Sequence, residues 1–172
     1  MLYQKIFIGF GSVVAVIIII YLFSAIYEFL TQPYHVYYPK KEITATPFDI
    51  RLYFEEIIFS SSDGINLSGW FVPARNHKGV ILVLHGNGEN ISTGLTFIDY
   101  FNRKLGLSVF IIDYRGYGKS EGRPTEKGTY LDARAAWEYL TGSKKIRPQD
   151  IIIFGRSLGG PIAAWLAKEV KA

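Results

Sequence analysis

The chain has 172 residues, of which 49% are apolar, and a formal net charge of +4. This length allows one domain with a hydrophobic core and is short for two. Because the chain has no cysteine, it cannot form disulfides, zinc–thiolate sites or a cysteine nucleophile. The basic residues are scattered through linkers and loops, without the interleaved aromatic residues of a nucleic-acid groove, so we expect no nucleic-acid partner.

Residues 6–27 form an apolar run of 22 residues without a charge. At about 1.5 Å per residue, a helix of this length covers roughly 33 Å and can cross a bilayer. We therefore expect residues 1–30 to be a single-pass membrane anchor, with the lipid bilayer as a partner. A cleaved signal peptide is the alternative, although its apolar region would be shorter and a small-residue cleavage site would follow. Positive charges flank both ends, which leaves the orientation open.

Residues 31–51 contain three prolines and no sustained periodicity, which indicates a juxtamembrane linker. Three tyrosines in this segment suit the headgroup region of a membrane, and ordinary packing of a linker explains them almost as well. They are Tyr34, Tyr37 and Tyr38.

The globular part is expected to span residues 52–172 and to begin with an antiparallel hairpin. Residues 52–61 and 65–74 are rich in β-branched and aromatic residues, and Asp63 and Gly64 between them are typical of a turn.

Three further apolar strands are predicted at residues 79–86, 108–116 and 151–155. The segments between them have apolar residues three or four positions apart, which predicts helices. These residues are Ile91, Leu95, Ile98, Phe101 and Leu105 in the first segment and Tyr130, Ala133, Trp137 and Leu140 in the second. The alternation predicts an α/β fold, with a mostly parallel sheet covered by helices on both faces.

The third of these strands leads directly into a G-x-S-x-G pattern formed by Gly155, Ser157 and Gly159. In such a nucleophile elbow the serine has a strained backbone, which small neighbours permit, and its hydroxyl stands clear of the sheet. The backbone N–H of Leu158 would then face an oxyanion that forms on an attacked carbonyl. The alternative is a glycine-rich tight turn whose serine has no chemical role.

A second loop, residues 84–90, follows a predicted buried strand and supplies the other candidate oxyanion donor, the backbone N–H of Asn87. Gly86 and Gly88 would let this loop approach a substrate closely. A phosphate-binding loop is the alternative, but it would need glycine at the position of Ile91. We expect His85 to be structural.

The stretches LHGNGEN (residues 84–90), DYRGYGKSEGRP (113–124) and GRSLGG (155–160) together resemble the α/β-hydrolase superfamily. The resemblance covers residues 52–172 and is greatest to a membrane-anchored, serine-aminopeptidase-like branch. It implies that Ser157 is the nucleophile, that the backbones of Asn87 and Leu158 form the oxyanion hole, and that no cofactor is needed. We assign Asp113 and Arg115 no catalytic role.

The resemblance also implies a catalytic acid and histidine on later strands and loops, and no residue here matches them. After Ser157 the ionisable residues are Lys168, Glu169 and Lys171. His35 and His77 do not lie where the family keeps its base, and the histidine spacing predicts no metal site. We therefore expect this chain to contain only the N-terminal part of an α/β-hydrolase domain, truncated after the elbow helix. Residues 151–155 would then be an unprotected edge strand.

The predicted function is a serine hydrolase that acts on an ester, thioester or amide, with a small-molecule or peptide acyl substrate. The chain alone is expected to be inactive. The alternative is a non-catalytic, membrane-tethered remnant or interaction module. A nucleotide sequence that encodes the missing aspartate and histidine after Ala172 would favour the enzyme.

Overall fold

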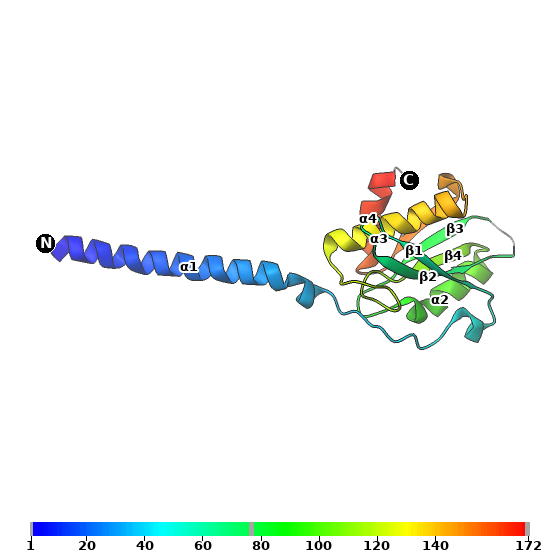
Figure 1. Cartoon of the computed structure of the whole chain (residues 1–172), viewed down its shortest axis with the longest axis horizontal. Helices are drawn as coiled ribbons and strands as arrows, with labels where there is room; N and C mark the ends of the chain where they lie inside the picture. The colour runs from blue at the N-terminus through cyan, green and yellow to red at the C-terminus, as the bar shows by residue number, and fades with distance from the viewer. Residues whose placement is uncertain (1, 76–77, 171–172) are drawn as a thin grey trace. The chain divides into compact units, whose positions relative to one another are not determined.

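A computed structural model describes residues 2–75 and 78–170, so His77 and Lys171 lie outside the described residues. The chain divides into two compact units, residues 1–36 and 37–172, and each is described by itself. Figure 1 shows the helix of the first unit and the layered α/β arrangement of the second.

The first unit is the helix α1, Leu2–Val36. Its segment Val13–Val36 is long and apolar enough to cross a membrane, with a mean hydropathy of 2.5. The helix extends beyond the predicted anchor, so residues 31–36 are helical rather than part of a linker. Residues 28–32 contain no helix breaker, and Pro33, which cannot donate a backbone hydrogen bond, comes only in the last turn. The Thr31 hydroxyl donates to the Tyr27 carbonyl at 2.8 Å.

The second unit contains one five-stranded sheet with the order β1-β2-β4-β3-β5. The strands are β1 (Glu55–Ser60), β2 (Asn66–Val72), β3 (Val80–Leu84), β4 (Ser108–Ile112) and β5 (Ile151–Gly155). The pairs β1–β2 and β2–β4 are antiparallel, whereas β4–β3 and β3–β5 are parallel. The predicted hairpin and parallel sheet are confirmed. Within the described residues β5 pairs only with β3, so it is an edge strand.

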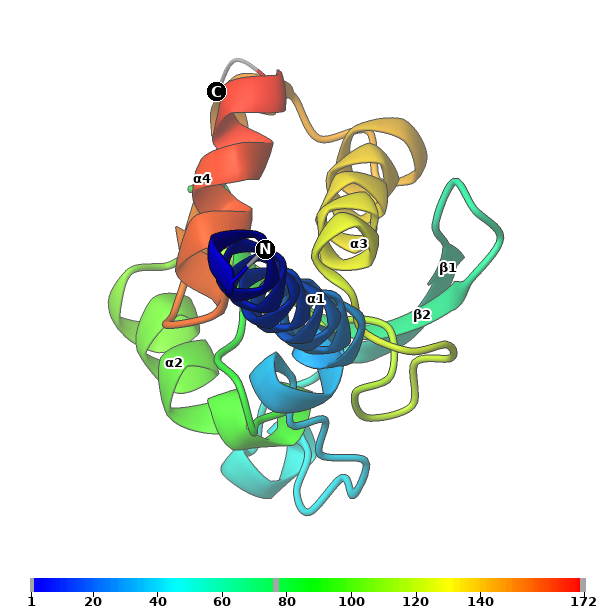
Figure 2. The same ribbon diagram turned by 90° about the vertical axis from the view of Figure 1, so that its left-hand side faces the viewer.

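Successive side chains of the central strands point to opposite faces of the sheet and enter two separate cores. Leu82 and Leu84 of β3 pack in the core that contains buried residues of α3 (Glu126–Glu138) and α4 (Gly159–Val170). Ile81 and Val83 pack in the other core, beside α2 (Leu95–Asp99). The helices α3 and α4 therefore cover one face and α2 the other, as the two views show (Figures 1 and 2).

The helical segment between β3 and β4 is not one continuous α-helix. A 3-10 turn (Ile91–Gly94) precedes α2, and a π-helical turn (Tyr100–Lys104) follows it. The backbone at Gly94 lies so close to β4 that an added Cβ would be 2.6 Å from the Ile111 Cδ1 atom. Predicted core residues such as Ile98 are buried, but Leu105 is 39% exposed because the segment has already ended.

Residues 37–51, expected to be a separate linker, belong to the second unit. The buried Asn90 amide donates to the carbonyls of Lys40 and Glu42 at 3.2 and 2.6 Å, respectively. Tyr37 is half-buried, and burial raises the pKa of its hydroxyl despite a hydrogen bond with Thr129. These contacts hold the segment against the domain, where Tyr37 is partly buried. A 3-10 turn, Pro47–Ile50, completes the segment.

Arg115 joins three parts of this unit. Its Nε donates to Oδ1 of the buried Asp132 in α3 at 2.9 Å, and its Nη1 donates to Asp63 in the β1–β2 turn at 2.7 Å. Burial raises the pKa of Asp132, and the hydrogen bonds from Arg115 only partly offset this. The pKa of Asp63 is lowered, chiefly by its hydrogen bond from Arg115. Arg115 therefore favours the charged form of both carboxylates, although burial outweighs this effect at Asp132.

Replacing Arg115 with Met should destabilise the fold by about 3–5 kcal/mol at neutral pH, because it leaves the buried Asp132 carboxylate unpaired. Without the guanidinium the folded-state pKa of Asp132 should rise further. If the pKa of Asp132 is higher in the folded than in the unfolded state, the protonated carboxyl favours folding. The free energy of unfolding is then fully retained below the unfolded-state pKa, and it decreases as pH rises through the folded-state pKa. Thermal unfolding of Arg115→Met should thus show a smaller deficit at about pH 4 than at about pH 8. An equal deficit at both values would contradict this role.

Candidate active site

The parallel pairing of β3 with β5 brings two candidate loops to one edge of the sheet. Leu84 at the end of β3 is in register with Gly155 at the end of β5. Since parallel strands end at the same edge, the loops that begin at His85 and Arg156 leave the sheet as neighbours. The Arg156 N–H also donates to the Leu84 carbonyl at 3.0 Å.

Ser157 has the backbone conformation of a nucleophile elbow. Its φ is +49°, in the left-handed region that non-glycine residues rarely adopt. The residue is exposed, and within residues 2–75 and 78–170 its hydroxyl has no hydrogen-bond partner. The Gly160 N–H donates to the Ser157 carbonyl at 2.8 Å, at the start of α4. The sharp turn thus presents the serine at the amino end of a helix.

Both glycines of the elbow are required by close backbone packing. A Cβ added at Gly159 would lie 2.1 Å from the Leu84 carbonyl oxygen and 2.9 Å from that of His85. A Cβ added at Gly155 would lie 2.1 Å from the Gly159 carbonyl oxygen. Such distances leave no room for a side chain, so glycine at these two positions lets α4 pack against the end of β3.

The loop after β3 is fixed through the Asn87 side chain. Asn87 Oδ1 accepts hydrogen bonds from the Tyr117 hydroxyl at 2.7 Å, the Tyr38 N–H at 2.9 Å and the Gly88 N–H at 3.0 Å. Burial raises the pKa of Tyr117 to about 12, so this hydroxyl stays protonated and can donate at neutral pH. Asn87 is therefore held by Tyr38, which precedes the first strand, and by Tyr117 in the loop after β4.

An ion pair links this loop to the elbow. The Arg156 guanidinium contacts Glu89 Oε1, while Glu89 Oε2 accepts the Gly86 N–H at 3.1 Å. The Arg156 guanidinium also lies 5.7 Å from the centre of the Phe97 ring in α2. Charge and backbone contacts thus tie the residue before Ser157 to the loop that carries Asn87.

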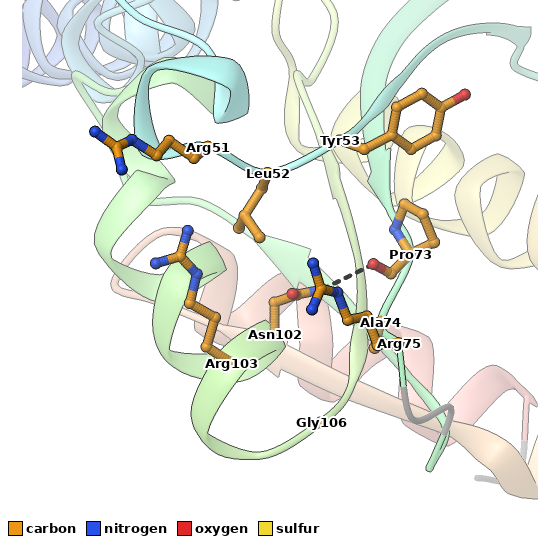
Figure 3. A pocket seen from close by; sticks show the side chains of 9 residues that line it. All are labelled: Arg51, Leu52, Tyr53, Pro73, Ala74, Arg75, Asn102, Arg103 and Gly106. Atoms are coloured by element: carbon orange, nitrogen blue, oxygen red, sulfur yellow. Dashed lines mark hydrogen bonds between the residues drawn. The ribbon is translucent and has the colours of Figure 1, made fainter.

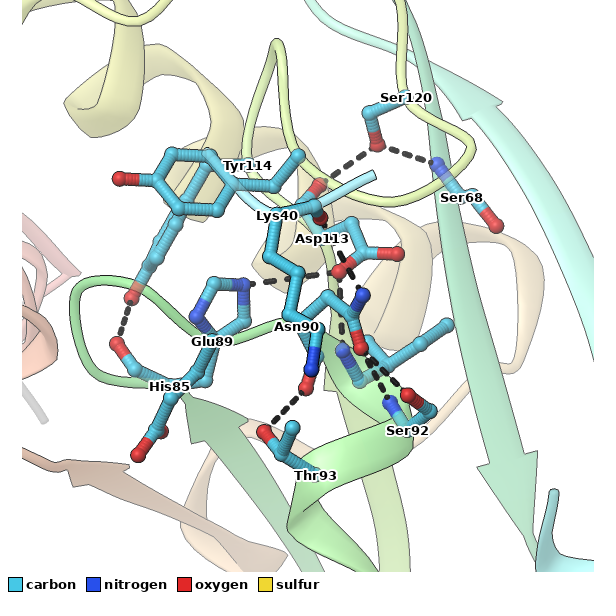
Figure 4. A network of polar contacts seen from close by, with 12 residues as sticks. Lys40, Ser68, His85, Glu89, Asn90, Ser92, Thr93, Asp113, Tyr114 and Ser120 are labelled. Carbon is cyan, nitrogen blue, oxygen red and sulfur yellow. Dashed lines mark hydrogen bonds and ion pairs between the residues drawn. The ribbon is translucent and has the colours of Figure 1, made fainter. Parts of the chain in front are cut away.

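His85 is enclosed in the protein interior (Figure 4). Its Nδ1 lies 2.8 Å from the Gly86 carbonyl oxygen, and its Nε2 lies 3.6 Å from Oδ1 of the buried Asp113. The same Asp113 oxygen accepts the Ile91 N–H at 2.9 Å, and the Tyr114 hydroxyl donates to the His85 carbonyl at 3.0 Å. These contacts connect the loops after β3 and β4, which fits the structural role expected for His85.

The structure brings together the loops of Ser157, Leu158 and Asn87, and within residues 2–75 and 78–170 the Ser157 hydroxyl has no hydrogen bond to an acid or a base. Glu169 lies on α4 with its carboxylate 3.8 Å from Arg134, and His35 belongs to α1 in the other unit. Among the described residues no group of three or more His, Asp or Glu side chains could hold a metal ion.

Contacts from residues distant in the sequence hold the site, and most of them were not predictable from local patterns. Asn90 was detectable in part, since asparagine before a helical segment is a common N-cap, and its Oδ1 accepts the Ser92 N–H at 3.0 Å. No local pattern indicated its bonds to residues 40 and 42, or the bond between Tyr117 and Asn87.

Replacing Gly159 with Ala should destabilise the domain by about 1–3 kcal/mol, because the new methyl group must displace the backbone at the end of β3. Gly160→Ala is the matched control: the next residue of the same helix has nothing within 4 Å of an added Cβ. This control should be neutral or stabilise by up to about 1 kcal/mol, through helix propensity. Thermal or urea unfolding measures both, and equal effects would contradict the packing argument.

Comparison with known proteins gives the family. Residues 75–172 match the family model of serine aminopeptidase, S33. The WAV2 α/β-hydrolase domain-containing protein of Arabidopsis thaliana is 37% identical over 96% of this chain and 54% of its own length. The uncharacterized membrane protein YNL320W of Saccharomyces cerevisiae is 36% identical over 73% of this chain and 44% of its own length. The chain therefore spans about half the length of these curated relatives.

Solved structures agree with this match. The Pyrococcus furiosus esterase Pf2001 has a TM-score of 0.66 at 26% identity, covering 77% of this chain and 51% of the esterase chain. An α/β hydrolase from Vibrio vulnificus has a TM-score of 0.62 at 36% identity, covering 69% of this chain and 40% of that one. The sheet order, the elbow and the family match together establish that the chain belongs to the serine aminopeptidase family of α/β hydrolases.

Proposed function

We propose that this chain carries the nucleophile and oxyanion hole of a membrane-anchored serine hydrolase that cleaves an ester, thioester or amide. The backbone of Ser157 carries the proposal: a non-glycine residue at φ +49° stands between a strand and a helix, with an exposed side chain. A strained conformation persists only where its surroundings enforce it, and such positions cluster at functional sites.

In the proposed reaction the Ser157 hydroxyl attacks the acyl carbon while a base takes its proton. The oxyanion is stabilised by the backbone N–H groups of Leu158 and Asn87. Collapse of the tetrahedral intermediate expels the alcohol, thiol or amine, which receives the proton, and water then releases the acid from the acyl-enzyme. We assign the base and its acid partner to the region by which the relatives exceed the matched half.

The helix α1 supports the membrane location, as does a relative named as a membrane protein. The solved esterase supports an acyl substrate, either a small molecule or a peptide. Neither α1 nor Ser157 requires a cofactor in this scheme. No feature of the described residues specifically favours the alternative of a non-catalytic remnant.

Ser157→Ala should abolish covalent labelling by a fluorophosphonate probe, because the probe reacts with an activated serine hydroxyl. The assay uses an enzyme completed with the region that the Arabidopsis relative carries beyond the match. Ser62→Ala is the control, since Ser62 is an exposed serine in the β1–β2 turn. Undiminished labelling of Ser157→Ala would place the nucleophile elsewhere.

The 172-residue chain alone should hydrolyse a p-nitrophenyl ester far more slowly than the completed enzyme. A serine hydrolase that lacks a triad member keeps a residual acceleration of only about 10³ to 10⁴ over the uncatalysed reaction in water. A folded completed enzyme that neither labels nor hydrolyses esters would favour the remnant.

The chain should remain with the membrane pellet after a carbonate wash, because a spanning helix is not released by high pH. The control replaces Ile17 and Ile18 with Arg in the middle of the apolar run, where each charge costs about 2.5–3.5 kcal/mol on insertion scales. This variant should appear in the supernatant. Release of the unchanged chain would contradict membrane spanning.

A further inference from the structure

A pocket of about 670 Å³ lies at the end of the sheet opposite to Ser157, near the end of β2 and the start of β4. The segment after β2, the end of the π-helical turn and the residues before β1 form its walls, and they include Arg51, Leu52, Pro73, Arg75, Asn102 and Arg103. Val72 of β2 is in register with Val109 near the start of β4, whereas Ser157 follows the end of β5. A five-residue strand covers about 16 Å, so the pocket is separate from the proposed catalytic site.

Three guanidinium groups give this pocket an excess of positive charge. Arg103 is held by Asp99, with Nε 3.2 Å from Oδ1, and it also donates to the Ile50 carbonyl. Within residues 2–75 and 78–170, Arg51 and Arg75 have neither an ion pair nor a side-chain hydrogen bond. By contrast, the exposed arginines elsewhere that pair with a carboxylate include Arg134, Arg147 and Arg156.

Hydrogen bonds hold the backbone of two walls of the pocket. The Asn102 amide donates to the carbonyls of Pro73 and Leu107 at 3.2 and 3.4 Å, which joins two walls (Figure 3). Arg51 ends a 3-10 turn, where its N–H donates to the Phe48 carbonyl at 2.8 Å. In Figure 3 the guanidinium groups of Arg75 and Arg103 lie below the Leu52 side chain. Arg75 and Arg103 thus flank an apolar surface, whereas the exposed Arg51 side chain points away from them in Figure 3 and would turn towards a bound anion.

We propose that this pocket binds a phosphate ester. Guanidinium groups bind phosphate oxygens in a bidentate manner, and two arginines that have no carboxylate partner among the described residues favour an anion that carries more than one negative oxygen. The volume fits a small organic molecule rather than a bare ion. Leu52, Pro73 and Ala74 would contact the organic part. The phosphate could belong to a lipid headgroup or to a soluble metabolite.

The test measures binding by calorimetry on the full chain in phosphatidylcholine nanodiscs, with empty discs subtracted. Two probes separate the sources: glycerol 3-phosphate and dihexanoylphosphatidic acid. The double variant Arg51→Gln, Arg75→Gln should weaken binding by roughly tenfold or more, since it removes both guanidinium groups and their charge-assisted hydrogen bonds to the phosphate. Lys127→Gln, Arg134→Gln on α3 makes the same change in net charge and should bind like the unmodified chain.

Similar affinities for the two probes would support a soluble phosphate ester, and tighter binding of the dihexanoyl lipid would support a headgroup. The proposal is overturned if neither probe binds saturably, or if both double variants weaken binding equally, since the latter reports only overall charge. Because no hydrolysis is measured, this outcome is independent of the proposed reaction.

Discussion

The contact of Gly159 with the end of β3 is the constraint on which the site depends. An added Cβ would meet the Leu84 carbonyl oxygen at 2.1 Å, so α4 can begin against β3 only through glycine. This approach makes the turn after β5 sharp enough to put Ser157 at φ +49°. It also sets the elbow beside the loop of Asn87, because β3 and β5 end in register. The proposed hydrolase site needs its nucleophile and its oxyanion donors in one fixed geometry, and these backbone contacts would provide it.

Residues 37–42, which precede the first strand of the domain, contribute to the same geometry. Their backbone is satisfied by side chains of the loop after β3, through Asn87 and Asn90. The Lys40 carbonyl also accepts the Gly118 N–H at 2.9 Å, in the loop after β4. The residues that follow α1 in the chain are therefore part of the site's support. A change in residues 37–42 should for this reason affect the loop that carries Asn87.

The parts that were predictable from the sequence are those that local patterns determine. Alternating and continuous apolar runs indicated the hairpin and the three parallel strands, and the glycines around Ser157 indicated the elbow. The end of α1 was missed because Pro33 was interpreted as a linker residue, although it occurs in the last helical turn. The bonds of Arg115 to Asp63 and Asp132, and of Asn90 to Lys40, join residues 17 to 52 positions apart. No periodicity encodes such pairs, so only the folded structure could reveal them.

The most direct test of the central claim is a crystal structure of the fluorophosphonate adduct in the completed enzyme. We expect phosphorus bonded to Ser157 Oγ, a positive φ at Ser157, and a phosphonyl oxygen about 2.7–3.1 Å from the backbone nitrogens of both Leu158 and Asn87. An adduct on another residue, or a phosphonyl oxygen that contacts neither backbone nitrogen, would contradict the assignment of nucleophile and oxyanion hole.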